Sequence, residues 1–195
     1  MEEPHVWTNI SQRNSVIYWQ NDWEMFIDPD GDALNYYEFE VNALNTIWEL
    51  TLDKPYSKGG HATHPTNIEG LVSAVHVKGT INNASDEDIG WNVEVAIPWE
   101  GLKKYNINPP TRSTPPVIGD TWRINFSRVE WEFRLDADGK YVRVPEENRW
   151  DVHCEENWSW RPQGEINMHI PERWGFVTFV DEAEEEREAL ANEML

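Results

Sequence analysis

The chain has 195 residues, a length that one compact domain accommodates, and its 36 acidic and 16 basic residues give a formal net charge of −20. Such a charge repels phosphate backbones and anionic lipids, so neither a nucleic acid nor a membrane is expected as a partner. The single cysteine excludes an internal disulfide. The 12 tryptophans exceed what one core needs, which predicts that some indoles lie at the surface.

Alternation of apolar and polar residues predicts strands along most of the chain. In chain order they cover 5–10, 23–27, 36–43, 47–52, 72–79, 91–97, 121–129 and 174–180. The pattern is clearest at 36–43, where Glu38 and Glu40 belong to a polar face opposite an apolar one. One short helix is predicted at 98–105, because Pro98 suits a first helical turn. The predicted fold is all-β, an antiparallel β-sandwich of the immunoglobulin or jelly-roll type.

Long loops and a charged tail complete the predicted organisation. Segments 53–70, 106–119 and 145–171 are rich in Gly, Pro, Asn and His without a regular period, which is typical of loops at the ends of a sandwich. The sandwich domain is expected to span 1–180. Residues 181–195 contain seven acids and one arginine, and they could form either a helix or a frayed, solvated end.

Loop aromatics are the first candidate binding site. Trp158 and Trp160 lie among Asn, Ser, Arg and Gln in a stretch that Pro162 and Gly164 mark as loop. An indole can pack on the apolar face of a sugar ring while neighbouring polar groups bind its hydroxyls. The alternative is that both indoles cap the core, and composition does not decide between the two.

Several segments together resemble carbohydrate-binding module family 9. The resemblance is carried by residues 21–32 (NDWEMFIDPDGD), 36–43 (YYEFEVNA), 90–99 (GWNVEVAIPW), 122–128 (WRINFSR), 160–164 (WRPQG) and 171–175 (PERWG), and it extends over residues 5–180. It implies a β-sandwich that holds the end of a sugar chain between two aromatic side chains, with structural calcium, appended to xylan-degrading or other glycan-degrading enzymes. An extracellular or periplasmic location is implied as well, although Met1–Pro4 lacks the chemistry of a signal peptide.

The resemblance also suggests roles for individual residues. Trp160 is similar to one jaw of the aromatic clamp, with Trp158 beside it, and either Trp19 or Tyr18 is similar to the other jaw. Glu24 and Asn42 resemble polar contacts to the sugar, whereas Glu40 stands where a sugar-binding member could place a basic residue. The family's opening strands are missing before residue 5, so Met1 is expected to be an internal start, and the chain to aggregate more than an extended version.

A calcium site is a further expectation. Asp28, Asp30 and Asp32 bring three carboxylates together at one turn, and hard oxygen ligands suit calcium. The spacing lacks the downstream glutamate of an EF-hand loop, so a solvated hairpin turn is the alternative. No organic cofactor is expected.

Two other function classes remain open. A glycoside hydrolase would need a pair of carboxylates, which Glu24, Glu38, Glu40 or Glu94 could supply from a polar sheet face. Ordinary surface strands also alternate acids with apolar residues, so binding without catalysis is the preferred interpretation. The third class is a structural or protein-binding sandwich whose sugar site has decayed.

Overall fold

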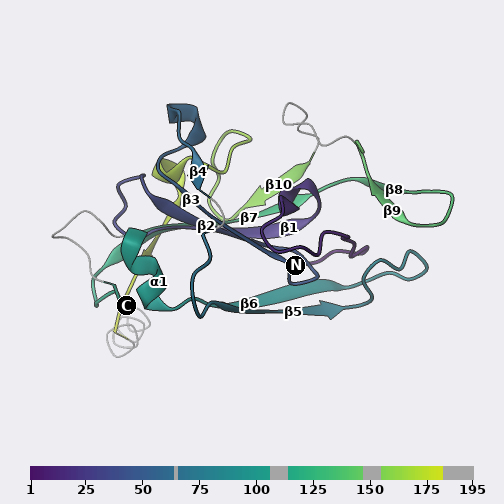
Figure 1. The fold of residues 1–195 in the computed structure, drawn as a ribbon, viewed down its shortest axis with the longest axis horizontal. Coiled ribbons are helices and arrows are strands. Elements are labelled where there is room, and N and C mark those ends of the chain that lie inside the picture. The colour runs from purple at the N-terminus through teal and green to yellow at the C-terminus, as the bar shows by residue number, and fades with distance from the viewer. Residues whose placement is uncertain (64–65, 106–113, 147–154, 182–195) are drawn as a thin grey trace, which may run out of the picture.

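The computed structural model describes residues 1–63, 66–105, 114–146 and 155–181, and it shows two packed layers of antiparallel strands (Figure 1). The larger layer, the main sheet, contains seven of the described strands in the order β10-β7-β1-β2-β3-β4, with β11 also paired to β7. Its strands are β1 (Asp22–Asp28), β2 (Tyr36–Val41), β3 (Ile47–Leu52), β4 (Ala62–Thr63), β7 (Thr121–Glu130), β10 (Glu156–Ser159) and β11 (Gly175–Thr178).

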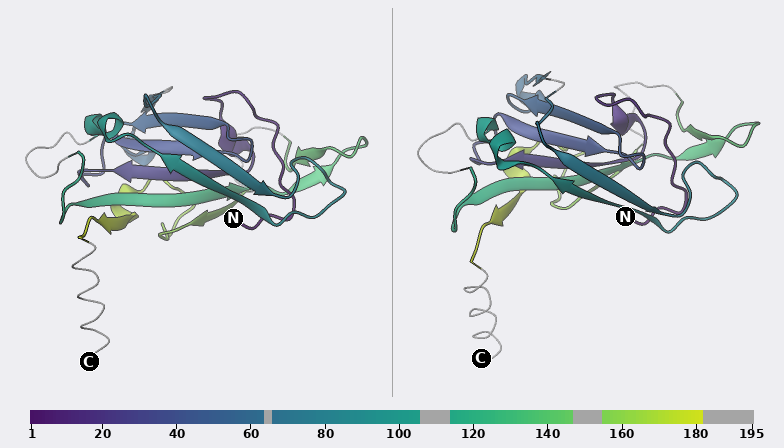
Figure 2. Two further views of the ribbon diagram at one scale, coloured as in Figure 1. Left: turned by 90° about the horizontal axis from the view of Figure 1, so that it is seen from below. Right: turned by 60° about the horizontal axis from the view of Figure 1, so that its bottom comes forward.

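The second layer is a hairpin of β5 (Val72–Lys78) and β6 (Gly90–Ala96), which runs obliquely across one face of the main sheet (Figure 2). A smaller hairpin of β8 (Phe133–Leu135) and β9 (Tyr141–Arg143) projects from the far end of β7 (Figure 1).

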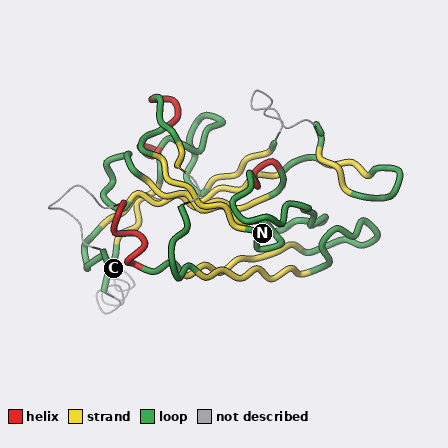
Figure 3. The backbone as a smooth tube through the Cα atoms, in the orientation of Figure 1, coloured by secondary structure: helices red, strands yellow, loops and turns green. Residues whose placement is uncertain are grey.

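Helices are short and lie at the periphery, between loops that connect the strands (Figure 3). They are α1 (Trp99–Leu102) and the 3-10 turns η1 (Ile17–Trp19), η2 (Tyr56–Lys58), η3 (Lys103–Tyr105) and η4 (Pro171–Arg173). No helix in the described part of the chain is long and apolar enough to cross a membrane.

The main core lies between the two layers. Side chains of alternate residues on a strand point to one face, and here Ile27, Tyr37, Phe39 and Trp122 are buried on the face that the hairpin covers. Valines of β5 and β6 pack against them from the hairpin. This face, called the inner face, has the period-two apolar pattern from which the strands were predicted.

The opposite face of the main sheet, called the outer face, is also covered. Phe26, Tyr36, Trp48 and Leu50 form a second buried cluster there with Trp174, which precedes β11. All six residues of β2 are consequently buried, including the two glutamates of its polar face. The polar residues of β2 therefore point away from solvent, into the region between the outer face and the segments that cover it.

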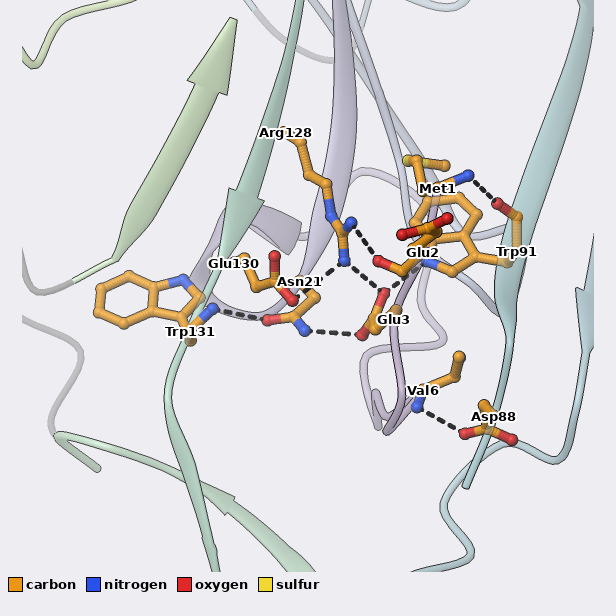
Figure 4. A network of polar contacts seen from close by, with 10 residues as sticks. All are labelled: Met1, Glu2, Glu3, Val6, Asn21, Asp88, Trp91, Arg128, Glu130 and Trp131. Atoms are coloured by element: carbon orange, nitrogen blue, oxygen red, sulfur yellow. Dashed lines mark hydrogen bonds and ion pairs between the residues drawn. The ribbon is translucent and has the colours of Figure 1, made fainter. Parts of the chain in front are cut away.

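The first residues connect the two layers through one carboxylate (Figure 4). Met1–Glu3 lies beside β6, where Glu2 bridges Gly90, and the Glu3 side chain points toward β7. Its carboxylate accepts hydrogen bonds from Trp91 Nε1 at 2.7 Å, Asn21 Nδ2 at 2.7 Å and Arg128 Nη2 at 2.9 Å. A buried carboxylate needs such donors, since burial alone raises its pKa.

The predicted strand at 5–10 is wrong. The backbone N–H of Val6 donates to Asp88 Oδ2 at 2.8 Å and that of Thr8 to Asn82 Oδ1 at 3.0 Å. Side chains thus take the donors that a strand would offer to a neighbouring strand, and the segment runs as irregular chain.

The predicted fold class is confirmed: the described chain is all-β and antiparallel, and its one short α-helix lies within the predicted range 98–105. The other seven predicted strands are present with ends shifted by one or two residues. Strands β4 and β10 were predicted as loop, and β8 and β9 were not predicted. Most of the loop at 106–119 and the tail from 182 onward lie outside the described residues, so the two-part organisation stays a prediction.

Candidate functional site

A pocket of about 550 Å³ opens on the outer face of the main sheet. Its floor is made by β1, β2 and β3, and its walls come from η1, η2 and the segments at 155–157 and 166–169. The lining residues are Val16, Tyr18, Glu24, Glu38, Glu40, Trp48, Leu50, Tyr56, Ala62, Val129, Glu155, Asn157, Ile166, Asn167, Met168 and His169.

Acidic side chains form the floor. Glu24 on β1 pairs directly with Glu40 on β2, and Glu38 lies two residues from Glu40, so strand geometry turns all three to the same face. Asp22 shares that face of β1, and its carboxylate comes within 4.8 Å of those of Glu24 and Glu40. These four acids are at most 5% exposed.

The floor has few hydrogen-bond donors of its own. Ser127 on β7 donates to Glu24 Oε2. Among the described residues, no donor in hydrogen-bonding geometry reaches Oε2 of Glu38 or Oε2 of Glu40, both of which belong to pocket-lining side chains. Buried acceptors without donors are costly and rare in native proteins, so these two oxygens indicate where a ligand would donate hydrogen bonds.

Burial and mutual repulsion hold protons on these acids. Desolvation raises the pKa of Glu24 to about 7, although the hydrogen bond from Ser127 opposes the rise. Desolvation, reinforced by neighbouring carboxylates, raises the pKa values of Asp22, Glu38 and Glu40 well above their usual range. A group that binds in the pocket therefore meets carboxyls that can give up protons.

Aromatic rings line the pocket together with the acids. Tyr18 of η1 stacks on Trp48 with ring centroids 6.2 Å apart and an interplanar angle of 15°. Tyr56 of η2 contacts the edge of His169 at 4.6 Å, and it is 48% exposed. Such rings offer flat apolar surface beside polar tips.

His169 is neutral at physiological pH. Burial lowers its pKa to about 3, and its Nδ1 lies 3.0 Å from the hydroxyl of Tyr36. Its Nε2 is 4.0 Å from Glu38 Oε1. No lysine or arginine of the described chain lines the pocket. Its walls thus provide no positive charge to balance the four acids.

The structure brings together three of the sequence-predicted site residues. Tyr18, Glu24 and Glu40 all line the pocket. Trp19, next to Tyr18, lies instead in a neighbouring hollow of about 450 Å³, with Arg143 and Glu146. Asn42 is fully buried away from the pocket. Its Nδ2 donates to Ile10 O at 2.8 Å, and its Oδ1 accepts from the Thr46 N–H at 3.0 Å, so it holds two loops together.

Trp158 and Trp160 belong to the other side of the sheet. Asn157 lines the pocket, and alternation along β10 turns Trp158 to the inner face, where it pairs with Arg128. The stretch around Trp158 was predicted as loop, and it is strand β10. The sequence does not reveal β10, because its four residues lie in a segment rich in turn-forming residues.

Trp160 follows β10 on the same inner side. Its ring packs on Phe126 at 5.7 Å, and Phe126 in turn stacks on Trp23 at 5.7 Å. A Cβ on Gly175 would come within 2.3 Å of this ring, so the indole rests on a glycine. Trp160 is 46% exposed, but it is not among the residues that line the pocket with Tyr18.

Sequence reasoning missed most of the pocket walls. Trp48, Tyr56 and His169 come from three separate segments, and no local pattern connects them. A signal did exist for the floor, since the alternating acids Glu38 and Glu40 on β2 share a face with Glu24.

The three aspartates of the turn after β1 do lie together. One carboxylate oxygen from each of Asp28, Asp30 and Asp32 comes within 4.8 Å of the others. Both oxygens of Asp28 accept backbone N–H groups, from Gly31 and Ala33, each at 2.9 Å. Asp32 Oδ1 accepts from the N–H of Leu34 at 2.8 Å. These bonds account for the turn itself, and the oxygen set also suits a calcium ion.

Comparison with known proteins finds similarity among solved structures. No family model matches the chain, and no curated protein matches it significantly. A crystal structure of a protein from Bacteroides uniformis ATCC 8492, described as a "putative carbohydrate-binding protein", is similar with a TM-score of 0.55. The two chains are 17% identical, and the match covers 91% of this chain and 69% of the other. The likeness shows a shared fold.

Proposed function

We propose that this protein binds a carbohydrate, without cleaving it, in the pocket on the outer face of the main sheet. The observation that carries the proposal is the pocket itself, whose lining combines the aromatic rings of Tyr18, Trp48 and Tyr56 with the carboxyl groups of Glu24, Glu38 and Glu40. Aromatic faces pack against sugar C–H groups while the polar groups fix the hydroxyls. The shared fold with a protein described as carbohydrate-binding supports the same function.

The pocket shape supports recognition of a chain end. Walls from η1, η2 and the segment at 166–169 bound the floor on several sides, which suits the end of a glycan better than a strand passing through. The sequence resemblance to carbohydrate-binding module family 9 supports the same mode, together with a role beside xylan-degrading or other glycan-degrading enzymes outside the cytoplasm.

A glycoside hydrolase is the second candidate, and the floor favours it. Glu24 has a pKa raised to about 7 and faces Glu40, as an acid and its partner would in a catalytic pair. One feature opposes the hydrolase: a catalytic pair needs one protonated and one ionised carboxyl group, and the closely packed acids of the floor do not divide into such a pair.

One experiment separates the two candidates. The protein is incubated with xylo- and cello-oligosaccharides and with amino-sugar oligomers, while tryptophan fluorescence and new reducing ends are measured. Binding without hydrolysis shifts the fluorescence, because Trp48 lies in the pocket, and releases no reducing ends. Sustained release that disappears in Glu24→Gln and persists in Glu94→Gln would establish the hydrolase instead, since Glu94 is exposed on β6.

A further inference from the structure

The floor of the pocket combines a high density of buried acid with unused acceptors. Asp22, Glu24, Glu38 and Glu40 converge from β1 and β2, and the pocket lining that the structure describes provides no lysine or arginine. Arg143 is a cation close to this region, but its guanidinium donates to Trp19 O and lies over the ring of Trp131 in the neighbouring hollow. The described pocket lining therefore brings no cation of its own to the floor, and a cationic ligand would favour the ionised form of its acids.

We propose that the ligand is a cationic sugar, an amino sugar whose free ammonium group lies against the carboxylates of Glu24, Glu38 and Glu40, the three floor acids that line the pocket. The inference rests on the proposed function and names the substrate class of that site. An ammonium has three N–H donors and no acceptor, so it can satisfy three convergent carboxylates at once.

The unpartnered oxygens are the observation that favours a donor-only ligand. Oε2 of Glu38 and Oε2 of Glu40 lack a donor from the described residues, and both side chains line the pocket and are at least nine-tenths buried. A neutral sugar hydroxyl donates only one hydrogen bond, whereas an ammonium donates three. An ammonium brings donors alone and compensates the repulsion between the acids.

The walls favour an organic cation over a bare metal ion. A calcium ion would use the floor oxygens and leave most of the 550 Å³ unoccupied. The sugar ring that carries the amine fills that space against Tyr18, Trp48 and Tyr56. Aromatic faces also attract cations, so the same walls stabilise both parts of the ligand.

Binding is expected to release protons. The titratable groups that line the pocket are Glu24 on β1, Glu38 and Glu40 on β2, Glu155 beside β10, and His169, together with the two wall tyrosines, and Asp22 lies beside Glu24 and Glu40. His169 is neutral and burial raises the pKa of both tyrosines, so Glu24, whose pKa is raised to about 7, is a group that changes charge near neutral pH. A cation favours their ionised form, and affinity therefore rises with pH while the amine stays charged.

The test is calorimetric titration with three oligosaccharides of equal length: glucosamine oligomers, their N-acetylated forms and cello-oligosaccharides. With chelator present, the glucosamine oligomers are expected to bind at least about tenfold more tightly than either neutral series. Their affinity should increase from pH 5 to pH 6, where the amine keeps most of its charge, with proton release detected by repeating the titration in buffers of different ionisation enthalpy. Added salt should weaken the binding.

Variants locate the effect on the floor. Glu40→Gln should lower glucosamine-oligomer affinity at least about tenfold and reduce the preference over neutral sugars, whereas Glu94→Gln should change neither. Glu38→Gln provides a second floor variant, and circular dichroism checks that each variant is folded. Equal or tighter binding of the neutral series overturns the inference and leaves the proposed function standing. Neutral-sugar binding that requires calcium overturns it in favour of a metal on the floor. Absence of binding in every arm overturns both.

Discussion

Glu24 and Glu40 are direct cross-strand partners on the outer face of the main sheet, with each side chain no more than 5% exposed. Like charges placed opposite one another normally destabilise a sheet. Proteins retain arrangements of this kind where the strain serves a site, and here the pair forms the floor of a pocket with aromatic walls.

The pH dependence of stability should report the protonation of Glu24. Its pKa is raised by folding from 4.5 to about 7, so the folded state binds the proton more tightly than the unfolded state. The free energy of unfolding should therefore decrease as pH rises through this range, by up to about 3 kcal/mol from this group.

Urea unfolding at pH 5 and pH 8 measures this effect. Glu24→Gln should remove part of the decrease and be more stable than the wild type at pH 8, with Glu94→Gln as the control. Equal pH dependence of wild type and Glu24→Gln would show that Glu24 does not hold its proton in the folded state.

Substitution of two half-exposed aromatic residues tests whether sugar binds in the pocket or at the clamp that the family resemblance places around Trp160. Tyr56 lines the pocket and is 48% exposed, whereas Trp160 is 46% exposed on the inner side of the sheet. If Tyr56 covers about 70 Å² of sugar, Tyr56→Ala should cost about 2 kcal/mol, or about thirtyfold in affinity. Trp160→Ala should leave affinity unchanged.

The family resemblance makes Trp160 one jaw of the clamp, so it predicts instead that Trp160→Ala loses sugar affinity and that Tyr56→Ala keeps it. Fluorescence or calorimetric titration of both variants decides between the two locations, and a loss confined to Trp160→Ala would move the site to the inner side.

Trp91 should be a structural residue. Its side chain is 2% exposed between the layers, and its Nε1 donates to Glu3 at 2.7 Å. Trp91→Ala should lower the free energy of unfolding by about 3 to 5 kcal/mol, because it leaves a cavity and removes one donor from a buried carboxylate. Denaturant unfolding measures the loss. A variant that keeps wild-type stability would show that the N-terminal network contributes little to the packing of β6.

Calcium should raise thermal stability if it binds at the aspartate turn. An ion that binds only the folded state raises the free energy of unfolding. The increase grows with the logarithm of the ratio of the ion concentration to its dissociation constant. Melting temperature is compared in calcium and in chelator, for the wild type and for Asp30→Asn. Asp28 is left intact, because its oxygens already hold the N–H groups of Gly31 and Ala33. An unchanged melting temperature would remove the calcium site.

Local patterns were sufficient for most of the fold. Period-two alternation at 36–43 and around Trp91 and Trp122 identified strands whose apolar faces are buried on the inner side, because side-chain direction along a strand depends only on position. The same reasoning failed at 5–10, where Asp88 and Asn82 bind the backbone from far along the chain. It also failed at β10, which pairs with β7 over a short stretch.

The sequence by itself determined the all-β class, the positions of seven of the strands and the presence of acids along one face of β2. Only the tertiary structure decided that this face is buried, that Trp48, Tyr56 and His169 enclose it, and that Trp160 lies on the other side of the sheet. Strand direction is a local property of the backbone, whereas a pocket depends on which distant segments cover a face. That covering is set by packing between segments, which no local period encodes.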